Sequence, residues 1–457
     1  MARPRKNADA SRASLLPESA PLPEIPVREQ PYPLPEGWKW VRLGDVTQIA
    51  SGGTPSSKTK EFYDNGNIPW LSPADLSNYN AVYISHGKKM LTPLGLKNSS
   101  ARLLPSNTVC LSSRAPIGYV VIAQNPLCTN QGFKNFLPSH LYIPRFLYWY
   151  LKGSKPLLES YASGTTFLEL SATKVARIPF PLPPREEQER IVGHIESLFA
   201  RLDEARQKAE AVRDSVALRR AAILHKAFTG ELTAKWREEQ GISKESWKKK
   251  DFAHIITNIE AGKNVRCEER PPRENEAGII KVSAVTWGFF NEMESKTCPD
   301  PSLYNENIQI KKGDFLFSRA NTLQLVGNCV IVENITKKLM LSDKILRFSL
   351  DECTLKNYLL FFSLSDQYRS QIENAASGNQ DGMRNISQKK LLGLTIPLPT
   401  LPEQREIVRL LDDLLGRERR IGEAADAVVA HIERMKKAIL ARAFRGELGR
   451  ADRPSRA

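Results

Sequence analysis

Two arginines stand at matching places in two stretches of this chain that resemble each other. Arg114 lies in SSRAPIGYVVI (112–122) and Arg319 lies in FSRANTLQLVGNCVI (317–331). A guanidinium can bind a guanine edge through two hydrogen bonds, or it can pair with a backbone phosphate. It can equally form a salt bridge inside its own domain. The matched arginines therefore indicate recognition of a polyanion as one interpretation, and a structural ion pair as the other.

Loops rich in glycine, hydroxyls and amides supply further candidates for such recognition. The first is Gly52, Gly53 and Thr54. The second is Ser163, Gly164, Thr165 and Thr166, and its counterpart in the second half is Ser377, Gly378, Asn379 and Gln380. Hydroxyls and amides can reach phosphates or bases, and an Asn or Gln side chain can pair with adenine. Weaker candidates are Asn130, Gln131 and Lys134 in the first half and Lys344 and Arg347 in the second. Each loop could also be an ordinary turn.

Catalytic motifs, in contrast, are absent from the sequence. Gly52-Gly53 lacks the lysine and the following Ser or Thr of a nucleotide-binding P-loop. No Asn-Pro-Pro-aromatic or Asp-Pro-Pro-aromatic tetrapeptide marks an adenine methyltransferase, and no acidic-x-Lys element of a nuclease follows Pro299-Asp300. The six histidines are too dispersed for a metal site visible from spacing. We expect neither a catalytic site nor a metal site in this chain.

The charge balance points to a polyanionic partner. The chain has a formal net charge of +15, and residues 37–180 hold 15 Lys and Arg against 6 Asp and Glu. Residues 243–396 hold 22 against 19. A basic surplus attracts nucleic acid. No apolar run is long enough to span a membrane, and the N-terminus has no apolar signal-peptide core. The six cysteines form no Cys-x-x-Cys pair, which is typical of reduced thiols and predicts a cytoplasmic setting.

One segment occurs twice in the chain, 216 positions apart. Residues 181–192 read PLPPREEQERIV and residues 397–408 read PLPTLPEQREIV. Extended without gaps to 181–232 and 397–448, the two copies are identical at about 20 of 52 positions. Prolines suit the first turn of a helix and glycine suits its end, so Gly230 and Gly446 are the expected stops. Each copy predicts a helix of about 40 residues, or about 60 Å.

Apolar residues in steps of four and three give each predicted helix a stripe along one side. The stripes are Ile191, Ile195, Leu198, Leu202, Val212 and Val216 in the first helix, and Ile407, Leu411, Leu414, Ile421, Val428, Ile432 and Met435 in the second. Such steps favour a coiled coil. Arg219 or Arg220 interrupts the first stripe and Glu418 the second. The small residues Ala205, Ala209 and Ala425 favour an antiparallel pair within the chain over a homodimer.

The parts between the helices also repeat, though more faintly. ASGTTFLELSATKVARIPFPLP (162–183) resembles ASGNQDGMRNISQKKLLGLTIPLP (376–399). We therefore predict an α+β protein with two similar target-recognition domains, separated by two long helices packed as an antiparallel, pseudo-two-fold-symmetric coiled coil. The predicted boundaries are a disordered tail at 1–33, domain 1 at 34–180, a helix at 181–236, domain 2 at 237–396, a helix at 397–448 and a tail at 449–457. Trp70, Phe146, Trp149 and Tyr150 are expected in the core.

This arrangement resembles the specificity subunit of type I restriction–modification enzymes. The resemblance is carried by LPEGWKWVRLGDVTQIASGGTPS, by the paired IPFPLPPREEQERIV and IPLPTLPEQREIV, and by the paired AF-x-GEL endings. It implies a non-catalytic DNA-binding chain that reads a bipartite, asymmetric site, one half with each domain. It further implies methyltransferase and restriction subunits as partners, two of each, and it assigns S-adenosylmethionine, ATP and Mg²⁺ to those partners. This chain itself would bind no cofactor.

Two other functions fit the residues as well: a stand-alone DNA-binding regulator and a coiled-coil scaffold that binds proteins. The nearly neutral helices, each with 10 basic against 9 acidic residues (185–235 and 397–448), favour binding of partner proteins there. Two domains on a rigid spacer predict half-sites about one turn of DNA (~34 Å) apart.

Overall fold

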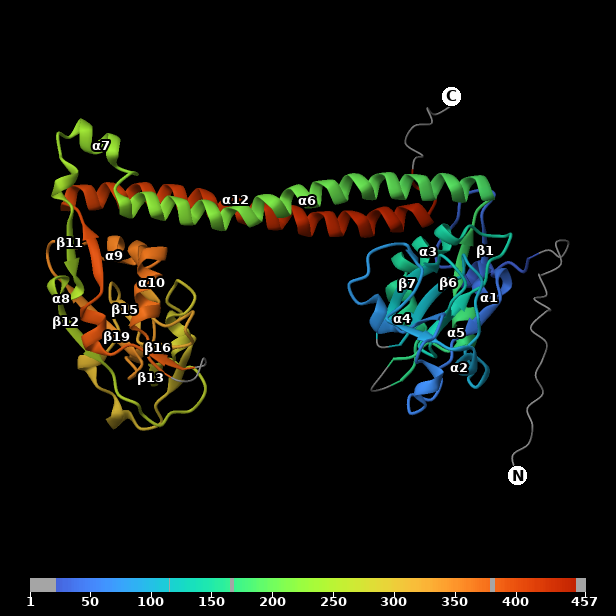
Figure 1. Ribbon diagram of the computed structural model, residues 1–457, viewed down its shortest axis with the longest axis horizontal. Helices are drawn as coiled ribbons and strands as arrows, with labels where there is room; N and C mark the ends of the chain where they lie inside the picture. The colour runs from blue at the N-terminus through green and yellow to red at the C-terminus, as the bar shows by residue number, and fades with distance from the viewer. Residues whose placement is uncertain (1–21, 115, 165–167, 379–382, 449–457) are drawn as a thin grey trace. The chain divides into compact units, whose positions relative to one another are not determined.

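The computed structural model describes residues 22–114, 116–164, 168–378 and 383–448 (Figure 1). The chain divides into two compact units. Unit 1 comprises residues 1–207 and 428–457, and unit 2 comprises residues 208–427. The helix α6 (Arg185–Thr229) begins in unit 1 and ends in unit 2, whereas α12 (Leu401–Phe444) begins in unit 2 and ends in unit 1. Each unit is therefore one α+β domain completed by parts of both long helices.

The described strands of unit 1 form three sheets, with strand orders β2-β9-β6-β7-β4, β5-β3-β8 and β1-β10. Its elements are β1 (Lys39–Arg42), α1 (Leu43–Val46), β2 (Ile49–Ser51), β3 (Ile68–Leu71), β4 (Tyr83–Ile84), β5 (Lys89–Leu91), α2 (Pro93–Lys97), β6 (Val109–Ser113), β7 (Ile117–Ala123), β8 (Cys128–Thr129), β9 (Phe133–Phe136), α3 (Pro144–Gly153), α4 (Lys155–Tyr161), α5 (Ala172–Ala176) and β10 (Pro179–Leu182). The central strands β6 and β9 are buried along their whole length, although β9 carries the polar residues Lys134 and Asn135 between its two phenylalanines.

Unit 2 repeats this architecture with sheets β12-β19-β15-β17, β14-β13-β18 and β11-β21 and a short β16-β20 pair. Its elements are α7 (Ala234–Glu239), β11 (Lys248–Asp251), α8 (Phe252–Ile255), β12 (Ile256–Ala261), β13 (Ala277–Ile280), β14 (Ser295–Thr297), β15 (Phe315–Ser318), β16 (Ala320–Asn321), β17 (Cys329–Ile331), β18 (Lys338–Met340), β19 (Ile345–Leu350), α9 (Lys356–Phe362), α10 (Asp366–Ala375), β20 (Arg384–Asn385), α11 (Gln388–Leu392) and β21 (Thr395–Leu398). In both units the middle strand of the three-stranded sheet has one antiparallel and one parallel neighbour. The two domains therefore have one fold, as predicted.

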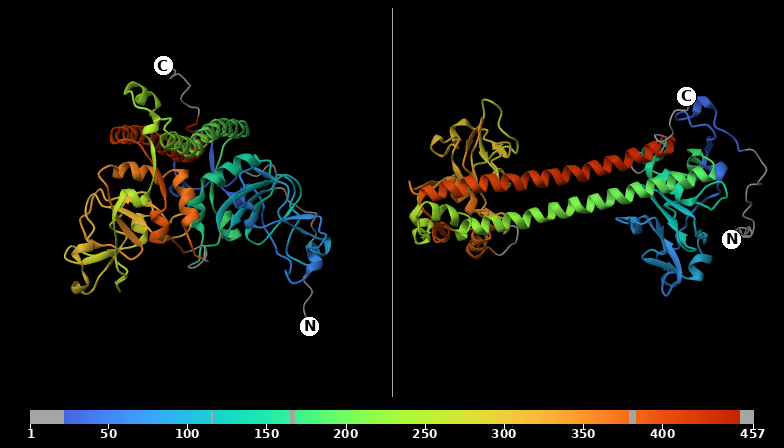
Figure 2. Two further views of the ribbon diagram at one scale, coloured as in Figure 1. Left: turned by 60° about the vertical axis from the view of Figure 1, so that its left-hand side comes forward. Right: turned by 90° about the horizontal axis from the view of Figure 1, so that it is seen from above.

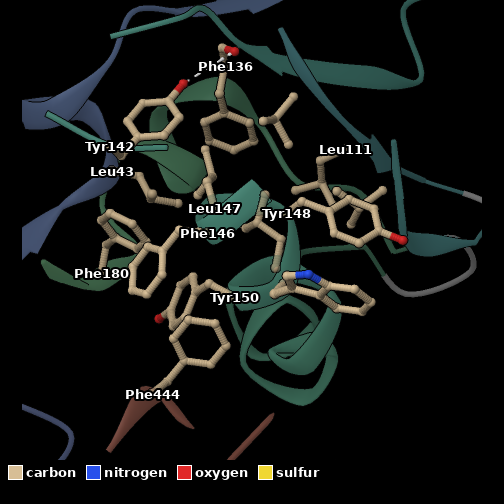
Figure 3. Packing of buried hydrophobic residues seen from close by; sticks show 14 of the residues in the cluster. Leu43, Leu111, Phe136, Tyr142, Phe146, Leu147, Tyr148, Tyr150, Phe180 and Phe444 are labelled. Atoms are coloured by element: carbon tan, nitrogen blue, oxygen red, sulfur yellow. Dashed lines mark hydrogen bonds between the residues drawn. The ribbon is translucent and has the colours of Figure 1, made fainter. Parts of the chain in front are cut away.

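An aromatic cluster joins the long helices to the core of each unit. In unit 1, Phe444 of α12 packs edge-on against Phe146 and Tyr150 of α3, which Figure 3 shows beside Phe180. In unit 2, Phe228 of α6 packs in the same way against Tyr358 and Phe362 of α9. The predicted core aromatics Trp70, Phe146, Trp149 and Tyr150 are all buried. The repeated Ala-Phe pair near each helix end is thus a core anchor.

The repeated glutamine of the EQ pair fixes the start of each helix to its own domain. The amide of Gln188 accepts from Ile143 N (2.8 Å) and donates to the carbonyls of Leu141 and Pro183, both at 3.0 Å. The amide of Gln404 accepts from Leu355 N (2.9 Å) and donates to the carbonyls of Cys353 and Pro399, at 2.8 and 2.9 Å. Both glutamines are almost completely buried. The Glu-Gln pair recurs in the sequence because its glutamine makes the same helix-to-domain hydrogen bonds in both units.

Within each unit the two long helices lie side by side and run in opposite directions, as Figure 2 also shows. In unit 1, Asp203 pairs with Lys436 and Arg206 pairs with Glu433. The residue number increases on α6 where it decreases on α12, so the two helices are antiparallel. In unit 2, Arg219 of α6 binds Glu418 of α12 through Nε, at 3.0 and 2.9 Å from its two carboxylate oxygens. These two residues, expected as interruptions of the stripes, therefore face each other.

The predicted stripes are buried unevenly. Ile191, Ile195, Ile407, Leu411 and Ile432 are buried, and Leu198, Leu202, Val216 and Leu414 are partly buried. Val212, Ile421, Val428 and Met435 are exposed by 39 to 45%. Their assignment to a closely packed stripe is therefore corrected: the buried residues on α12 include Leu415, Ala425 and Leu440 instead. The buried apolar residues of the helices lie mostly where each helix packs on its domain. Farther along the helices, ion pairs such as Arg219–Glu418 connect α6 to α12.

Unit 1 includes described residues that precede the predicted domain boundary at residue 34. Ile25 is buried and its N–H donates to Trp40 O at 2.8 Å, while the hydroxyl of Tyr32 donates to Phe444 O at 3.1 Å. Residues 22–33 therefore pack on unit 1 and are not a free tail. Residues 1–21 and the predicted tail at 449–457 lie outside the described residues.

Candidate nucleic-acid interface

Most of the predicted binding residues of unit 1 converge at one edge of its central sheet. Strands β2 and β6 end there, at Ser51 and Ser113, and the antiparallel β9 begins there, at Phe133. Gly52 to Thr54 and Arg114 directly follow the first two strands, while Asn130 and Gln131 lie two to three residues before the third. We call these positions sheet edge 1. Sheet pairing alone thus brings together residues that lie as far apart in sequence as Gly52 and Gln131.

The two glycines of sheet edge 1 are required by close backbone contact. Gly53 N donates to Thr129 O at 2.9 Å, and Gly53 O accepts from the indole of Trp70 at 2.9 Å. A Cβ on Gly52 would lie 1.9 Å from Asn130 O, so no other residue fits there. Thr54 is exposed and its hydroxyl donates to the side chain of Gln131, which is also exposed. The glycines therefore shape the loop, and Thr54 and Gln131 are its accessible groups.

Two cations and one carboxylate lie beside this loop. Arg114 is partly exposed and its Nη1 lies 4.0 Å from Oε2 of Glu169. Lys134 is only 5% exposed, and its Nζ lies 3.4 Å from the hydroxyl of Ser113. Burial lowers the pKa of Lys134; the charge of Arg114 lowers it too, against the opposing effect of Glu169. Of these two cations, Arg114 is the more accessible, whereas Lys134 is buried and bonds to the end of β6.

The base of the Ser163-Gly164 loop is attached to sheet edge 1. Ser163 and Glu169 exchange two backbone hydrogen bonds of 2.9 and 3.1 Å, and Leu170 N donates to Ser113 O at 2.9 Å. Gly164 has φ +127°, which a residue with a side chain rarely adopts. Thr165 and Thr166 lie outside the described residues. The structure therefore places the base of this loop next to Arg114, which the sequence analysis had not predicted.

Unit 2 has the equivalent position, which we call sheet edge 2. Arg319 N donates to Lys344 O at 3.0 Å, and Arg319 O accepts from Ile386 N at 2.9 Å. The guanidinium of Arg319 donates to Asn385 Oδ1 at 3.4 Å. Gly378 has φ +139° and lies on the loop whose base pairs Ser377 with Asn385. Asn379 and Gln380 lie outside the described residues. Arg319, Lys344 and Gly378 are therefore neighbours. Arg319 takes the place of Ser113, one residue before Arg114, because Ile386 N bonds Arg319 O as Leu170 N bonds Ser113 O.

Arg347, in contrast, is engaged within the domain. Its guanidinium binds Glu260 at 2.5 Å and Asp314 at 3.0 Å, and donates to the carbonyls of Gln309 and Asn307. Burial acts to lower its pKa, but the two carboxylates outweigh that effect and raise it. The arginine is only 13% exposed. The geometry favours a structural salt bridge for Arg347 over the predicted contact with nucleic acid.

Three residues of these edges were not singled out from the sequence. Gly262 of unit 2 corresponds to the glycine pair of unit 1, because a Cβ there would lie 1.7 Å from Leu341 O. The loose match of ASGG with EAG at the domain starts was the available signal. Glu169 and Asn385 occupy equivalent bridge positions next to the two arginines. They could not be found by alignment, since their residue types differ.

Membrane-spanning helices and metal-binding clusters are absent from the described residues. In that part of the chain, no helix is long and apolar enough to cross a membrane. Within the same residues, no three His, Cys, Asp or Glu side chains are grouped so that they could hold a metal ion. The grouped features that remain are the two sheet edges and the helix pair.

Comparison with known proteins adds a family relationship. A family model described as "Type I restriction modification DNA specificity domain" matches residues 35–212 and again residues 250–423. The chain is 32% identical over 325 residues to the type I restriction enzyme MjaIX specificity subunit of Methanocaldococcus jannaschii, covering 66% of this chain and 74% of that one. It is 27% identical over 433 residues to the EcoKI specificity subunit of Escherichia coli K12, covering 91% and 90%.

Two solved structures share the fold. One, from work on complex assembly and conformational transition of the type I R-M system, matches with a TM-score of 0.70 at 20% identity, covering 92% of this chain and 100% of that one. The HsdS subunit from Thermoanaerobacter tengcongensis matches with a TM-score of 0.58 at 21% identity, with the same coverage. At these identities the likeness concerns the fold alone.

Proposed function

Because the chain belongs to the family of type I restriction–modification DNA specificity subunits, we propose that it reads a bipartite, asymmetric DNA sequence, one half with each domain. The observation that supports this most is the repetition of one sheet edge in two units. In each unit a partly exposed arginine, a glycine at a turn and a Ser-Gly loop lie at the same end of the central sheet. Two copies of one surface suit two half-sites.

The proposed asymmetry of the site rests on differences between the two edges. Glu169 stands beside Arg114 in unit 1, and the neutral Asn385 stands beside Arg319 in unit 2. A carboxylate can accept from a cytosine amino group, whereas an amide can both donate and accept. The two domains would then prefer different base edges. A dimer with two identical domains would instead select a palindrome.

The chemistry of methylation and restriction would belong to partner subunits in the same cytoplasmic complex. We propose two adenine methyltransferase subunits and two restriction subunits as these partners, docked at least in part on the two helices. The exposed, nearly neutral helix surface supports this assignment, because it offers many charged groups of both signs and no basic surplus. S-adenosylmethionine, ATP and Mg²⁺ would bind to those partners.

Mapping of methylated adenines tests the proposal directly. Cells that carry this chain with its methyltransferase partner should show one bipartite, non-palindromic motif with a gap of several unread base pairs. Cells that lack the chain should show none of it. A single continuous motif would contradict the assignment of one half to each domain. Purified chain alone should not methylate DNA, and activity should appear when the methyltransferase subunit is added.

The proposed role of the helices as a spacer needs a separate experiment. Removal of one helical turn from both α6 and α12 should change the number of unread base pairs, because the helices would set the distance between the half-sites. An unchanged gap would contradict this role. Co-purification with a methyltransferase would distinguish the proposal from a stand-alone DNA-binding regulator. Salt-dependent binding to duplex DNA would distinguish both from a protein-binding scaffold.

A further inference from the structure

Two free cysteines of unit 2 lie next to each other. The Sγ atoms of Cys267 and Cys298 are 3.4 Å apart, although the residues are 31 positions apart in sequence. Cys298 is 5% exposed and Cys267 is partly exposed. The sulfur atoms are in contact but not bonded. A small rotation of one side chain would bring them to the ~2.05 Å of a disulfide bond.

The backbone around the two cysteines has the geometry of a cross-strand pair. Glu268 and Thr297 exchange two backbone hydrogen bonds, of 2.9 and 3.1 Å, and so form a hydrogen-bonded antiparallel pair. The next opposite pair is Cys267 with Cys298, at a non-hydrogen-bonded position. Accordingly, Cys298 N donates away from Cys267, to Ala277 O at 2.9 Å. Such pairs have Cα atoms about 4.5 Å apart, within the ~4.4–6.8 Å of disulfides.

We propose that Cys267 and Cys298 form a thiol modification site at which a low-molecular-weight disulfide converts the dithiol into a cross-strand disulfide. The Cys267 thiolate attacks one sulfur of the small disulfide, forms a mixed disulfide and releases one small thiolate. Cys298 then loses its proton and attacks Sγ of Cys267, which releases the second small thiol. The protein loses two electrons and two protons, and one small disulfide is reduced to two thiols.

The surroundings set the order of these steps. Burial, and next the hydrogen bond with Cys267, raise the pKa of Cys298 to about 12, so this buried thiol is a poor first nucleophile. Cys267 is the more exposed thiol and precedes the bridge residue Glu268 at the end of an exposed arm. This arm begins at Gly262 of sheet edge 2 and carries the exposed cations Lys263 and Arg266. Oxidation would tie it covalently to the residue after β14.

Peptide mapping of the full chain tests the proposal. Reduced protein is incubated with oxidised glutathione, alkylated and digested with trypsin without reductant. The expected product is one cross-linked species joining residues 267–273 to residues 297–311, which reduction separates into its two peptides. Recovery of both peptides as fully alkylated thiols after incubation would overturn the proposal. So would a Cys267–glutathione adduct that never resolves to the cross-link.

Two variants control the experiment. Cys353→Ser removes an exposed thiol elsewhere in unit 2 and should leave the yield of cross-link unchanged. Cys267→Ser should abolish it while thermal unfolding of the reduced protein stays unchanged, which shows that the variant folds. Oxidised wild-type protein should unfold about 5 °C or more above reduced protein, because the bond closes a long loop in the unfolded chain. An equal or lower unfolding temperature would contradict a strain-free cross-strand bond and overturn the proposal.

Discussion

Strands β9 of unit 1 and β19 of unit 2 correspond, and they carry Lys134 and Arg347 at adjacent positions that face opposite sides of the sheet; these two cations have opposite surroundings. Lys134 pairs in register with Leu111 and Ser51, and Arg347 pairs in register with Leu316 and Glu260. The nearest hydrogen-bond partner of Lys134 is the neutral hydroxyl of Ser113, whereas Arg347 is held by two carboxylates. Corresponding strands therefore support a buried amine whose nearest partner is neutral in unit 1, and an arginine held by two carboxylates in unit 2.

This difference shows that the scaffold constrains shape more than charge. The glycine at the end of β2 or β12 is needed in both units, because a backbone carbonyl from the neighbouring turn occupies the place of its Cβ. The side chains on the strands can change sign or partner without changing the sheet. A pair of domains with one fold can therefore acquire two specificities, since the residues at the edges vary independently.

The largest expected difference between the units lies at the starts of the long helices. Glu403 is completely buried and binds Arg237, Thr233 and the indole of Trp247. Its counterpart Glu187 is partly exposed and binds Arg190 one turn away. Glu403→Ala should lower the stability of unit 2 by about 3 to 5 kcal/mol, because it leaves a buried guanidinium unpaired.

Hydrogen exchange measured separately on peptides of each unit checks this prediction. The matched variant Glu187→Ala should cost unit 1 less than about 1 kcal/mol, as is usual for an exposed pair on a helix. Equal losses in the two units would show that the buried network contributes no more than the exposed pair.

The next largest difference is expected at Lys134 and Arg347. Arg347→Met should destabilise unit 2 by about 2 to 3 kcal/mol, since Glu260 and Asp314 lose their shared partner in a partly buried place. Lys134→Met should instead leave unit 1 unchanged or stabilise it by about 1 kcal/mol, because the cost of burying an amine is removed. Denaturant unfolding followed by unit-specific hydrogen exchange measures both. Destabilisation by both variants would contradict the contrast.

The pH dependence of unit 1 gives an independent check on Lys134. Its pKa is lower in the folded state than in the unfolded chain, so the unfolded state binds more protons between the two values. The stability of unit 1 should therefore rise as the pH increases through the lowered pKa towards ~10.4, the value of free lysine. Lys134→Met should remove this rise. A wild-type profile that falls over the same interval would contradict the sign.

The sequence predicted the repeated parts of the fold well, because repetition and periodicity depend on local patterns. The helices that begin near PLPPREEQ and PLPTLPEQ were located from prolines, apolar steps and the glycines at 230 and 446, and both glycines have positive φ after the helix ends. Burial along the helices was predicted less well. Val428 and Met435 fit the spacing but are exposed, whereas Ile432, Leu440 and Phe444 of the same helix are buried.

The candidate site was predictable only where the two halves kept the same residue. Arg114 and Arg319 were found because both lie in a Ser-Arg-Ala motif. The partners Glu169 and Asn385 differ in type, and their proximity depends on how a loop returns to the strand. Arg347 was placed among the binding residues because an isolated arginine in a sequence gives no sign of its carboxylates. Glu260 lies 87 positions away and reaches it only through the pairing of β12 with β19.

Removal of either sheet-edge arginine should affect one half of the DNA site. Arg114→Ala and Arg319→Ala should each weaken binding to the full site roughly 10- to 100-fold, if the guanidinium contacts a base. Each variant should relax the sequence preference in its own half only. Competition binding with DNA substituted in one half at a time measures this. Uniform weakening across sequences would assign the arginine to a phosphate, and unchanged binding would leave it with its structural role beside Glu169 or Asn385.

The smallest expected effect comes from exchanging the residues that distinguish the two edges. Glu169→Asn gives unit 1 the neutral partner of unit 2 and frees Arg114 from a carboxylate 4.0 Å away, so DNA affinity should rise a few-fold and the gain should shrink with salt. Asn385→Glu should lower affinity by a similar factor, because it places a carboxylate next to Arg319. Fluorescence anisotropy at two salt concentrations measures both changes. A shift in the same direction for both variants would show that the charge beside the arginine does not distinguish the two units, and that shape alone does so.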